Sequence, residues 1–486
     1  MIEIQSKIHD KFSVEFKVGF LVGDQLSKND FQVNTWIFIP NSLDINPLTY
    51  DKDRFYRDIR SNVRLITPIY TLHELADEES LPFCSLKTAC LNLKQNPSAT
   101  DQTEYEAQIK MYVSILKSSL RDFVRAVKIH STEESIDNYI RSYLEDMKKI
   151  ICSYHSLWEI IDLNTVSSSM KELYRFGDEF GSNLIERTSY LLIQYLQLNH
   201  KEGNSPLCEE LFRLIDMIQQ YKHEQGYLEV NADSKTHNRE FVFRIGTLKK
   251  YIESDLYLTA RKKKNTFIAE QIFFSLAAGM SMVFATVVAF SFQQKYGSYT
   301  MPLFIALVVS YMFKDRIKDL LRYYFAHKLS SKFFDHKTDI SIKNQSIGWS
   351  KEGFDFMLEN KVPPRVMELR NRSTLIEAEN RRMSEKIILF RKRVRLIGKL
   401  VRKASAYPLP GINDIVRLNL SDFMRKMDNP EIPLFAPDGA SNYHIINGEK
   451  IYYINFIIQC KYQEMVLYKR YRLSVNKQGI KHMESF

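Results

Sequence analysis

The sequence predicts an α+β protein that also carries membrane-spanning helices, and three observations predict this class. An uncharged apolar run of 19 residues lies near the middle of the 486-residue chain. Residues 12–39 contain stretches of alternating apolar and polar side chains, which is the period of a strand, and from about residue 103 the apolar period becomes helical. We therefore expect a two-helix transmembrane hairpin between a mixed strand and helical-bundle amino-terminal region and a carboxy-terminal α+β domain.

The first hundred residues are predicted to form a small module that contains strands. Apolar side chains alternate strictly from Phe12 to Val22, and Phe31 to Ile39 repeats the pattern after a polar break. Val63 to Thr67 is a third candidate strand. Alternation over four to eight residues is typical of a half-buried strand, so residues 1–100 are assigned to this module.

Residues 101–258 are predicted to form a helical bundle. Apolar residues recur there at three- and four-residue intervals, which places them on one face of each helix. Ser131 and Glu134 have the spacing of a capping box, and Ser205-Pro206 has the pattern of a helix start. We expect Thr247 to Leu258 to continue directly into the first membrane span as one long helix.

The hairpin is assigned to residues 259–328, with spans at about 268–292 and 298–316 followed by an amphipathic extension. Ile272 to Phe290 lacks any charge, and as a helix it reaches about 28 Å, which matches the hydrocarbon core of a bilayer. Ser298 to Phe313 reaches only about 24 Å, so that span requires local thinning of the bilayer or outward-reaching basic side chains. The alternative interpretation of the first run is a buried helix of a soluble core.

Basic residues flank both spans and predict their orientation. The short connection between the spans holds only Lys295, whereas basic residues cluster on the two outer flanks. Because such residues are retained on the cytoplasmic side, we expect a multi-pass protein of the inner (cytoplasmic) membrane with both termini in the cytoplasm. The flanking residues expected to contact anionic lipid headgroups are Arg261, Lys262, Lys263, Lys264, Lys314 and Arg316.

Small residues recur at four-residue intervals along the predicted spans. Such residues let helix backbones approach closely in lipid, where no hydrophobic force brings helices together. The pattern favours either packing of the two spans against each other or self-association into a homo-oligomer. The residues predicted to pack are Ala277, Gly279, Ser281, Ala285, Ala289, Ala306 and Ser310.

The carboxy-terminal domain, residues 329–486, is basic. Residues 331–486 hold 28 Lys and Arg against 17 Asp and Glu, whereas residues 1–260 carry a net charge of −8. The predicted strand Lys386 to Leu396 contains most of one basic cluster, which either contacts anionic lipid or forms a solvated edge strand. Nucleic acid is an unlikely partner because only Phe390 is available to stack on a base. The cluster residues expected to contact lipid are Arg391, Lys392, Arg393 and Arg395.

The last forty-four residues predict an antiparallel meander. Asn447-Gly448 has the composition of a two-residue hairpin turn, because both turn positions favour positive φ, and it stands between two apolar runs. Met465 to Val475 is predicted as the next strand, and a turn at NKQG leads to a final short one.

No pattern of catalytic or metal-binding residues identifies an active site, and we expect no cofactor. GFLVGD at residues 19–24 lacks the spacing and the Lys of a phosphate-binding loop, and neither HExxH nor GxSxG occurs. Cys152 and His155 can supply two metal ligands, but no second pair with zinc-like spacing accompanies them. The Asp51 and Asp53 pair is interpreted as a solvated turn. An odd number of cysteines, five, fits free thiols in a reducing compartment.

These observations predict a membrane protein that acts by binding, as a sensor or scaffold that oligomerises through its spans and meets an unidentified cytoplasmic protein partner. One alternative is an oligomeric effector or channel that permeabilises the membrane. A second alternative is a membrane-tethered enzyme, which requires scattered carboxylates or histidines to converge in space.

Overall fold

The computed structural model describes residues 2–23, 27–95, 97–129, 133–199, 206–265, 267–297, 300–324, 334–342, 345–370, 385–403, 407–439 and 442–486. The chain divides into two compact units. The sheet unit comprises Met1–Arg64, Leu258–Ala404 and Gly411–Phe486, and the helical unit comprises Leu65–Tyr257 and Ser405–Pro410.

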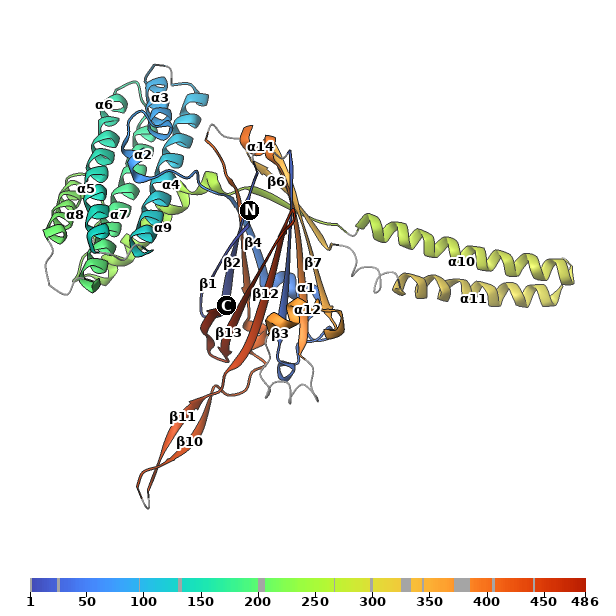
Figure 1. Cartoon of the computed structure of the whole chain (residues 1–486). Coiled ribbons are helices and arrows are strands. Elements are labelled where there is room, and N and C mark those ends of the chain that lie inside the picture. Colours follow the sequence, from blue (N-terminus) through green and yellow to red (C-terminus); the bar gives the residue numbers. More distant parts are fainter. Residues whose placement is uncertain are drawn as a thin grey trace. The chain divides into compact units, whose positions relative to one another are not determined.

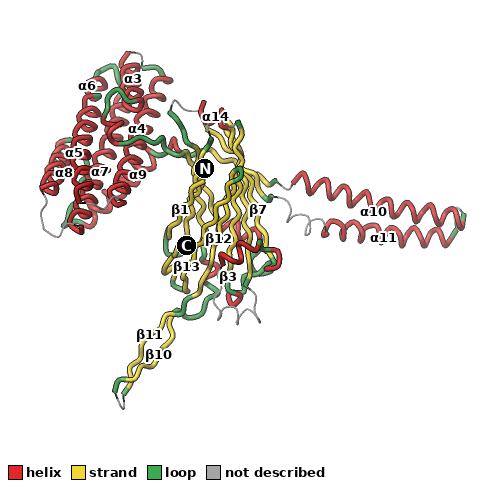
Figure 2. The backbone as a smooth tube through the Cα atoms, in the orientation of Figure 1, coloured by secondary structure: helices red, strands yellow, loops and turns green. Residues whose placement is uncertain are grey.

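An eight-stranded antiparallel sheet forms the larger part of the sheet unit (Figure 2). Strand β3 comes from the amino-terminal region and lies between two strands that are more than 300 residues later in the chain. In sheet order the strands are β14 (Gly479–Ser485), β13 (Met465–Asn476), β12 (Tyr452–Tyr462), β3 (Lys28–Ile39), β8 (Lys386–Ile397), β7 (Gln345–Met357), β6 (His336–Ile342) and β5 (Thr259–Lys264).

A second, four-stranded sheet packs against the first through aromatic side chains. The rings of Phe16 and Phe456 lie 5.2 Å apart, and those of Phe20 and Phe31 lie 5.1 Å apart, so the core fills the space between the sheets. Its strands, in order, are β1 (Ile2–Ile8), β2 (Ser13–Leu21), β9 (Gly411–Asn419) and β4 (Ile59–Leu65). Short helices accompany the sheets: α1 (Lys52–Asp58), α12 (Pro364–Arg370), α14 (Gly398–Lys403) and α15 (Ser421–Met424).

The α+β class and the carboxy-terminal antiparallel meander are confirmed. Strands β12, β13 and β14 pair consecutively, and β2, β3, β4 and β8 coincide with predicted strands. However, the strands of residues 1–64 hydrogen-bond with those of residues 386–462, so both regions belong to one unit. The interpretation of residues 386–396 as an edge strand is wrong, because β8 lies between β3 and β7.

The predicted turn at Asn447-Gly448 is also wrong. Both residues lie inside strand β11 (Tyr443–Glu449), opposite Pro433 and Ile432 of strand β10 (Glu431–Pro437). The positive φ of this hairpin occurs at Gly439, where φ is +77°. A side chain at Gly448 would meet Leu434 at 2.7 Å, so close packing by Leu434 accounts for the glycine.

The helical unit is a bundle around one apolar core (Figure 1). Gly177 permits close helix packing, because a Cβ at that position would meet the Tyr154 hydroxyl at 2.5 Å. The predicted cap at Ser131 lies outside the described residues. The helices are α2 (Leu72–Ala76), α3 (Leu81–Gln95), α4 (Ala99–Ile129), α5 (Glu133–Ser156), α6 (Trp158–Ile161), α7 (Ser168–Asn199), α8 (Pro206–Glu224) and α9 (Lys235–Ile252).

The expected continuous helix into the first span is not formed. Helix α9 ends at Ile252, a 3-10 turn follows at Ser254–Leu256, and the basic segment before the span is the strand β5. The run of basic residues pairs with β6 instead of extending the helix.

Two long helices, α10 (Phe267–Tyr296) and α11 (Met301–Tyr324), lie side by side (Figure 1). Among the described residues, Gln271–Tyr296 is the one helical segment whose length and apolar composition suit a membrane span. α11 continues without a break through the predicted amphipathic extension as far as Tyr324.

Candidate functional site: the foot of the helical hairpin

The hairpin α10–α11 is inserted between two neighbouring strands of the eight-stranded sheet. β5 ends at Lys264 just before α10, β6 begins at His336 after α11, and these two residues lie opposite each other in the sheet. The backbone N–H of Asn265 donates to the carbonyl of Asp335 at 2.9 Å, and its side-chain amide donates to the carbonyl of Phe334 at 3.1 Å. We call this junction, residues 264–265 and 334–336, the hairpin foot.

Asp335 ties the hairpin foot to the rest of the sheet unit. One carboxylate oxygen accepts from Lys52 Nζ at 2.6 Å, and the other accepts from the Tyr56 hydroxyl at 2.9 Å and from the Phe354 N–H at 2.8 Å. The carboxylate is buried and accepts from three donors, so its charge is well compensated. Helix α1 and strand β7 are therefore held at the same point as the end of the hairpin.

A buried charge cluster of Glu352, Lys392 and Asp414 lies next to this junction. Lys392 Nζ is 2.9 Å from Glu352 Oε1, donates to Ser61 Oγ at 3.0 Å and forms an ion pair with Asp414. Ser61 Oγ also donates to Asp414 Oδ1 at 2.6 Å. Because β7 and β8 belong to one sheet and β4 and β9 to the other, the cluster links the two sheets across their interface.

Lys262, on the basic strand β5 that precedes α10, contacts the charge cluster. Its Nζ donates to the second oxygen of Glu352 at 3.0 Å and lies 4.7 Å from the centre of the Tyr56 ring. Tyr56 in turn packs edge-on against His336, with ring centroids 4.3 Å apart. Polar and aromatic contacts thus run from the hairpin foot to the interface between the sheets.

The electrostatics of the cluster follow from burial and pairing. Burial opposes ionisation of Glu352, but Lys392 and Lys262 outweigh it and lower the pKa of Glu352 to about 2. Burial also opposes charge on Lys392, whereas Asp414 and Glu352 raise its pKa above the ordinary value. Glu352 and Lys392 are therefore both charged at neutral pH.

A second ion pair, between Arg391 and Asp355, lies beside the hairpin foot, and the pKa of its carboxyl group is closer to neutral pH. Arg391 donates to Asp355 at 2.7 Å, and its guanidinium lies 5.5 Å from the Phe334 ring. Burial raises the pKa of Asp355 to about 6, with a further contribution from Asp335, although Arg391 and Lys52 act in the opposite direction. The pKa of His336 is lowered, first by burial and then by the charge of Lys262.

A small cavity of about 40 Å³ lies between the sheets beside the charge cluster. Lys392 and Asp414 line it together with aliphatic and aromatic side chains such as Phe20 and Phe55. Since a buried water needs roughly 10–15 Å³ of such space, this cavity has the volume of only about three water molecules. It is far smaller than a typical ligand pocket of roughly 300 Å³ or more.

Some of the basic residues predicted to contact lipid are exposed, whereas others are buried or form ion pairs within the chain. Arg261, Lys263 and Lys264 are exposed on β5, and Arg316 and Arg393 are also exposed. By contrast, Lys392 was predicted to contact lipid, but its buried side chain is only 4% exposed and is held by Glu352 and Asp414. Four of the predicted residues form ion pairs elsewhere within the chain: Lys262 pairs with Glu352, Lys263 with Asp339, Arg391 with Asp355, and Arg395 with Asp30.

Four of the predicted small residues lie at the contact between the two long helices. Ala277 and Ser281 of α10 and Ala306 and Ser310 of α11 are buried. Ala285 and Ala289 are half-buried, whereas Gly279 faces outward, where a Cβ would meet nothing within 4 Å. Most of the predicted set is therefore occupied in packing α10 against α11.

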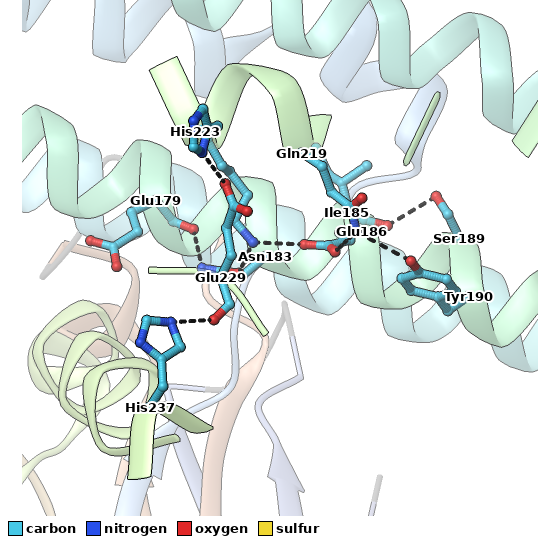
Figure 3. Close-up of polar contacts among 11 residues, drawn as sticks. Glu179, Asn183, Ile185, Glu186, Ser189, Tyr190, Gln219, His223, Glu229 and His237 are labelled. Atoms are coloured by element: carbon cyan, nitrogen blue, oxygen red, sulfur yellow. Dashed lines mark hydrogen bonds and ion pairs between the residues drawn. The ribbon is translucent and has the colours of Figure 1, made fainter. Parts of the chain in front are cut away.

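The helical unit contains polar clusters of its own. Lys222 donates to Asn183 at 2.9 Å and to Glu186 at 2.8 Å. Gln219 also donates to Glu186, at 2.9 Å (Figure 3). His155 does not join a metal site with Cys152: it lies 3.1 Å from Asp178, and no group of three potential ligands occurs among the described residues. These contacts join α5, α7 and α8 and stabilise the bundle.

The charge cluster was missed by analysis of the sequence, although β8 carries one signal for it. Ile388, Phe390, Lys392, Val394 and Leu396 occupy alternating positions, and all five are buried. A lysine at an inward position of an apolar alternation requires a buried acidic partner. The sequence does not identify that partner, because Glu352 and Asp414 lie on other strands. Comparison of the chain with protein-family models, curated proteins and solved structures found no match.

Proposed function

We propose that the chain is a membrane-anchored sensor or scaffold held by the α10–α11 hairpin, which spans the inner membrane twice. Both termini lie in the cytoplasm in this proposal, and the sheet and helical units bind a cytoplasmic partner. Binding is transmitted to the hairpin through the hairpin foot.

The exposure of apolar side chains on both helices supports a lipid environment. Phe290 on α10 and Met301, Phe304 and Met312 on α11 are each more than 60% exposed. Soluble monomers rarely expose contiguous apolar surface on this scale. In lipid these side chains meet acyl chains, while the small residues between the helices permit close packing.

The position of the hairpin foot is the observation that carries the sensor proposal. The helices interrupt a pair of hydrogen-bonded strands, and α10 begins at Phe267, shortly after β5 ends at Lys264, so movement of α10 is expected to act on β5. Asp335 and Lys262 connect those strands to α1 and to the charge cluster between the sheets. A rearrangement of the sheets thus has a physical route to the hairpin foot.

An effector and an enzyme are the competing proposals. The effector requires oligomeric spans, and leakage of dye from vesicles that contain the purified protein would favour it. The enzyme requires a substrate-sized site. The clustered carboxylates and lysines of the sheet unit adjoin a cavity of only about 40 Å³ and neutralise one another, so they do not favour catalysis.

Membrane extraction and site-specific labelling test the topology. Washed membranes should retain the full chain in carbonate at high pH and release it in detergent. With the exposed native thiols Cys84 and Cys152 changed to serine, Lys295→Cys should react with an impermeant maleimide in cells whose inner membrane is intact. Arg393→Cys, which is exposed on the sheet unit, should react only after permeabilisation. Release by carbonate, or the reverse labelling pattern, contradicts the proposal.

A further inference from the structure

Strands β10 and β11 form a two-stranded ribbon of their own (Figure 1). Apolar side chains stand on both of its faces: Leu434 is 53% exposed on one face, and Phe435 and Ile445 are 68% and 58% exposed on the other. A two-stranded ribbon is at best marginally stable in water without a covering layer or a further strand. The ribbon therefore requires a partner.

The hydrogen-bond pattern identifies which edge of the ribbon is open. Lys450 N–H donates to the carbonyl of Pro430, and Asp438 N–H donates to that of Asn442, each at 2.8 Å. Hydrogen-bonded and non-hydrogen-bonded pairs alternate in an antiparallel ladder. The even-numbered residues therefore direct their backbone N–H and carbonyl groups inward, toward the other strand of the ribbon, and the odd-numbered residues direct theirs outward, away from it.

Proline blocks one edge and leaves the other free. On β10 two outward positions are Pro433 and Pro437, which have no N–H to donate. On β11 the outward positions all retain their donors. They are Tyr443, Ile445, Asn447 and Glu449. The β11 edge is thus the one that can accept a further strand.

We propose that β11 pairs in antiparallel fashion with β11 of a second copy of this chain, with Ile446 on the two-fold axis. This register sets Ile445 against Asn447 of the second copy and Tyr443 against Glu449 of the second copy. Residues whose N–H and carbonyl groups point outward then lie opposite one another. The N–H groups of Ile445, Asn447 and Glu449 each find a carbonyl on the second copy, whereas the Tyr443 N–H donates to Asn442 Oδ1 at 2.9 Å. The result is a four-stranded sheet with a closed, isologous interface.

The register and the charge favour a second copy over the bilayer. No two like charges face each other across the axis, because Glu449 lies opposite a tyrosine. Residues 431–449 contain Glu431, Asp438 and Glu449 but no Lys or Arg, so an anionic membrane surface repels the ribbon. This inference does not depend on the proposed sensor function.

Disulfide trapping in the full-length protein tests the pairing. In the background that lacks Cys84 and Cys152, Ile446→Cys should give a cross-linked dimer about tenfold or more faster than Leu434→Cys, because disulfides need Cα atoms within about 7 Å. Leu434 is the matched control: it lies opposite Ile446 on the same face and is similarly exposed. In the proposed sheet its two copies are separated by three strand spacings, about 14 Å. Equal rates for the two variants overturn the proposal.

A proline variant tests the same edge without a thiol. Ile445→Pro removes one outward N–H and leaves the inward ladder intact, as Pro433 already does on the opposite strand. We expect the mass of the protein in detergent to fall from that of two chains to that of one. An unchanged mass contradicts the proposal. A second result also contradicts it. If the fluorescence of a Phe435→Trp variant shifts to the blue on anionic vesicles while the protein stays monomeric, the ribbon binds the bilayer and not a second copy.

Discussion

At the scale of single residues, the main feature of the sheet unit is a lysine at an apolar position. Lys392 is charged, almost fully buried and neutralised by Glu352 and Asp414. Such a cluster contributes little net stability compared with an apolar core, but removal of one member leaves an unpaired buried charge. The cluster joins the two sheets, and its integrity is sensitive to substitution.

Lys392→Met should lower the free energy of unfolding by about 3–5 kcal/mol, because two carboxylates lose their shared cation in a buried site. The neighbouring Arg393→Met changes an exposed side chain on the same strand and should shift stability by less than about 0.5 kcal/mol. Denaturant unfolding of both variants in detergent provides the comparison. Similar values for the two substitutions argue against a buried charge cluster.

Asp355 gives a prediction about pH. Its pKa is raised to about 6 in the folded protein, so between about pH 4 and pH 6 the folded chain binds more protons than the unfolded chain. The contribution of this group to stability consequently falls as pH rises through that window. Asp355→Asn removes this titration. The free energy of unfolding of the variant, relative to that of the wild type, should therefore rise by about 1–3 kcal/mol from pH 4 to pH 7. Parallel unfolding titrations measure it, and a difference that does not change with pH contradicts it.

At the scale of elements, the two long helices meet through small side chains. Ala277 is fully buried at this contact, and the outward-facing Gly279 lies two residues away on the same helix. The contact explains why small residues recur at these positions, because bulkier ones separate the helices.

Ala277→Leu should therefore destabilise the packing of α10 on α11 by about 1–3 kcal/mol through overpacking. Gly279→Leu introduces the same side chain where nothing lies within 4 Å, and it should leave the helix pair intact. Disulfide formation between cysteines placed on the two helices reports the packing in membranes. If only the Gly279→Leu variant loses the cross-link, then Gly279 and not Ala277 lies at the contact between the helices.

The hairpin foot can be tested in the same way with a pair of aspartates. Asp335→Asn weakens the contacts with Lys52 and Tyr56, whereas Asp339→Asn changes a more exposed carboxylate in β6 that pairs with Lys337 and Lys263. We expect faster amide hydrogen exchange at β5, β6 and the start of α10 only in the first variant. Exchange that changes equally in both variants, or in neither, contradicts a coupling role for Asp335.

At the scale of the whole molecule, charge is distributed unevenly along the chain. Residues 261–330 hold ten Lys and Arg against three Asp and Glu. The four basic residues 261–264 are exposed on β5, although Lys262 also pairs with Glu352. Basic residues close to an anionic membrane surface each contribute about 1 kcal/mol of attraction. The segment next to the proposed spans is thus suited to an anionic leaflet.

In nanodiscs that contain anionic lipid, the β5 amides should exchange more slowly than in zwitterionic nanodiscs. Changing Arg261, Lys263 and Lys264 to glutamine should abolish the difference, because the headgroup contacts are electrostatic. Three exposed basic residues of the helical unit, Lys87, Arg213 and Lys249, form the matched control set. If the same substitutions in the control set also abolish the difference in exchange, then the net charge of the protein, and not the β5 residues, causes that difference.

The sequence by itself determined the local elements of this protein. Alternation predicted β2 and β3, helical periodicity predicted the bundle, and the uncharged run predicted a helix able to cross a membrane. Whether a segment forms a helix or a strand depends largely on residues that are close in the sequence, so the period of its apolar residues predicts the element.

Only the tertiary structure decided which elements meet. Ser61 and Lys392 are 331 residues apart in the chain yet hydrogen-bonded, and β3 pairs with both β8 and β12. The same holds for Asn447-Gly448, whose turn-like composition is overridden by pairing with β10. Strand partners and buried ion pairs depend on contacts between distant segments, and no local pattern specifies the partner of a strand or of a buried charge.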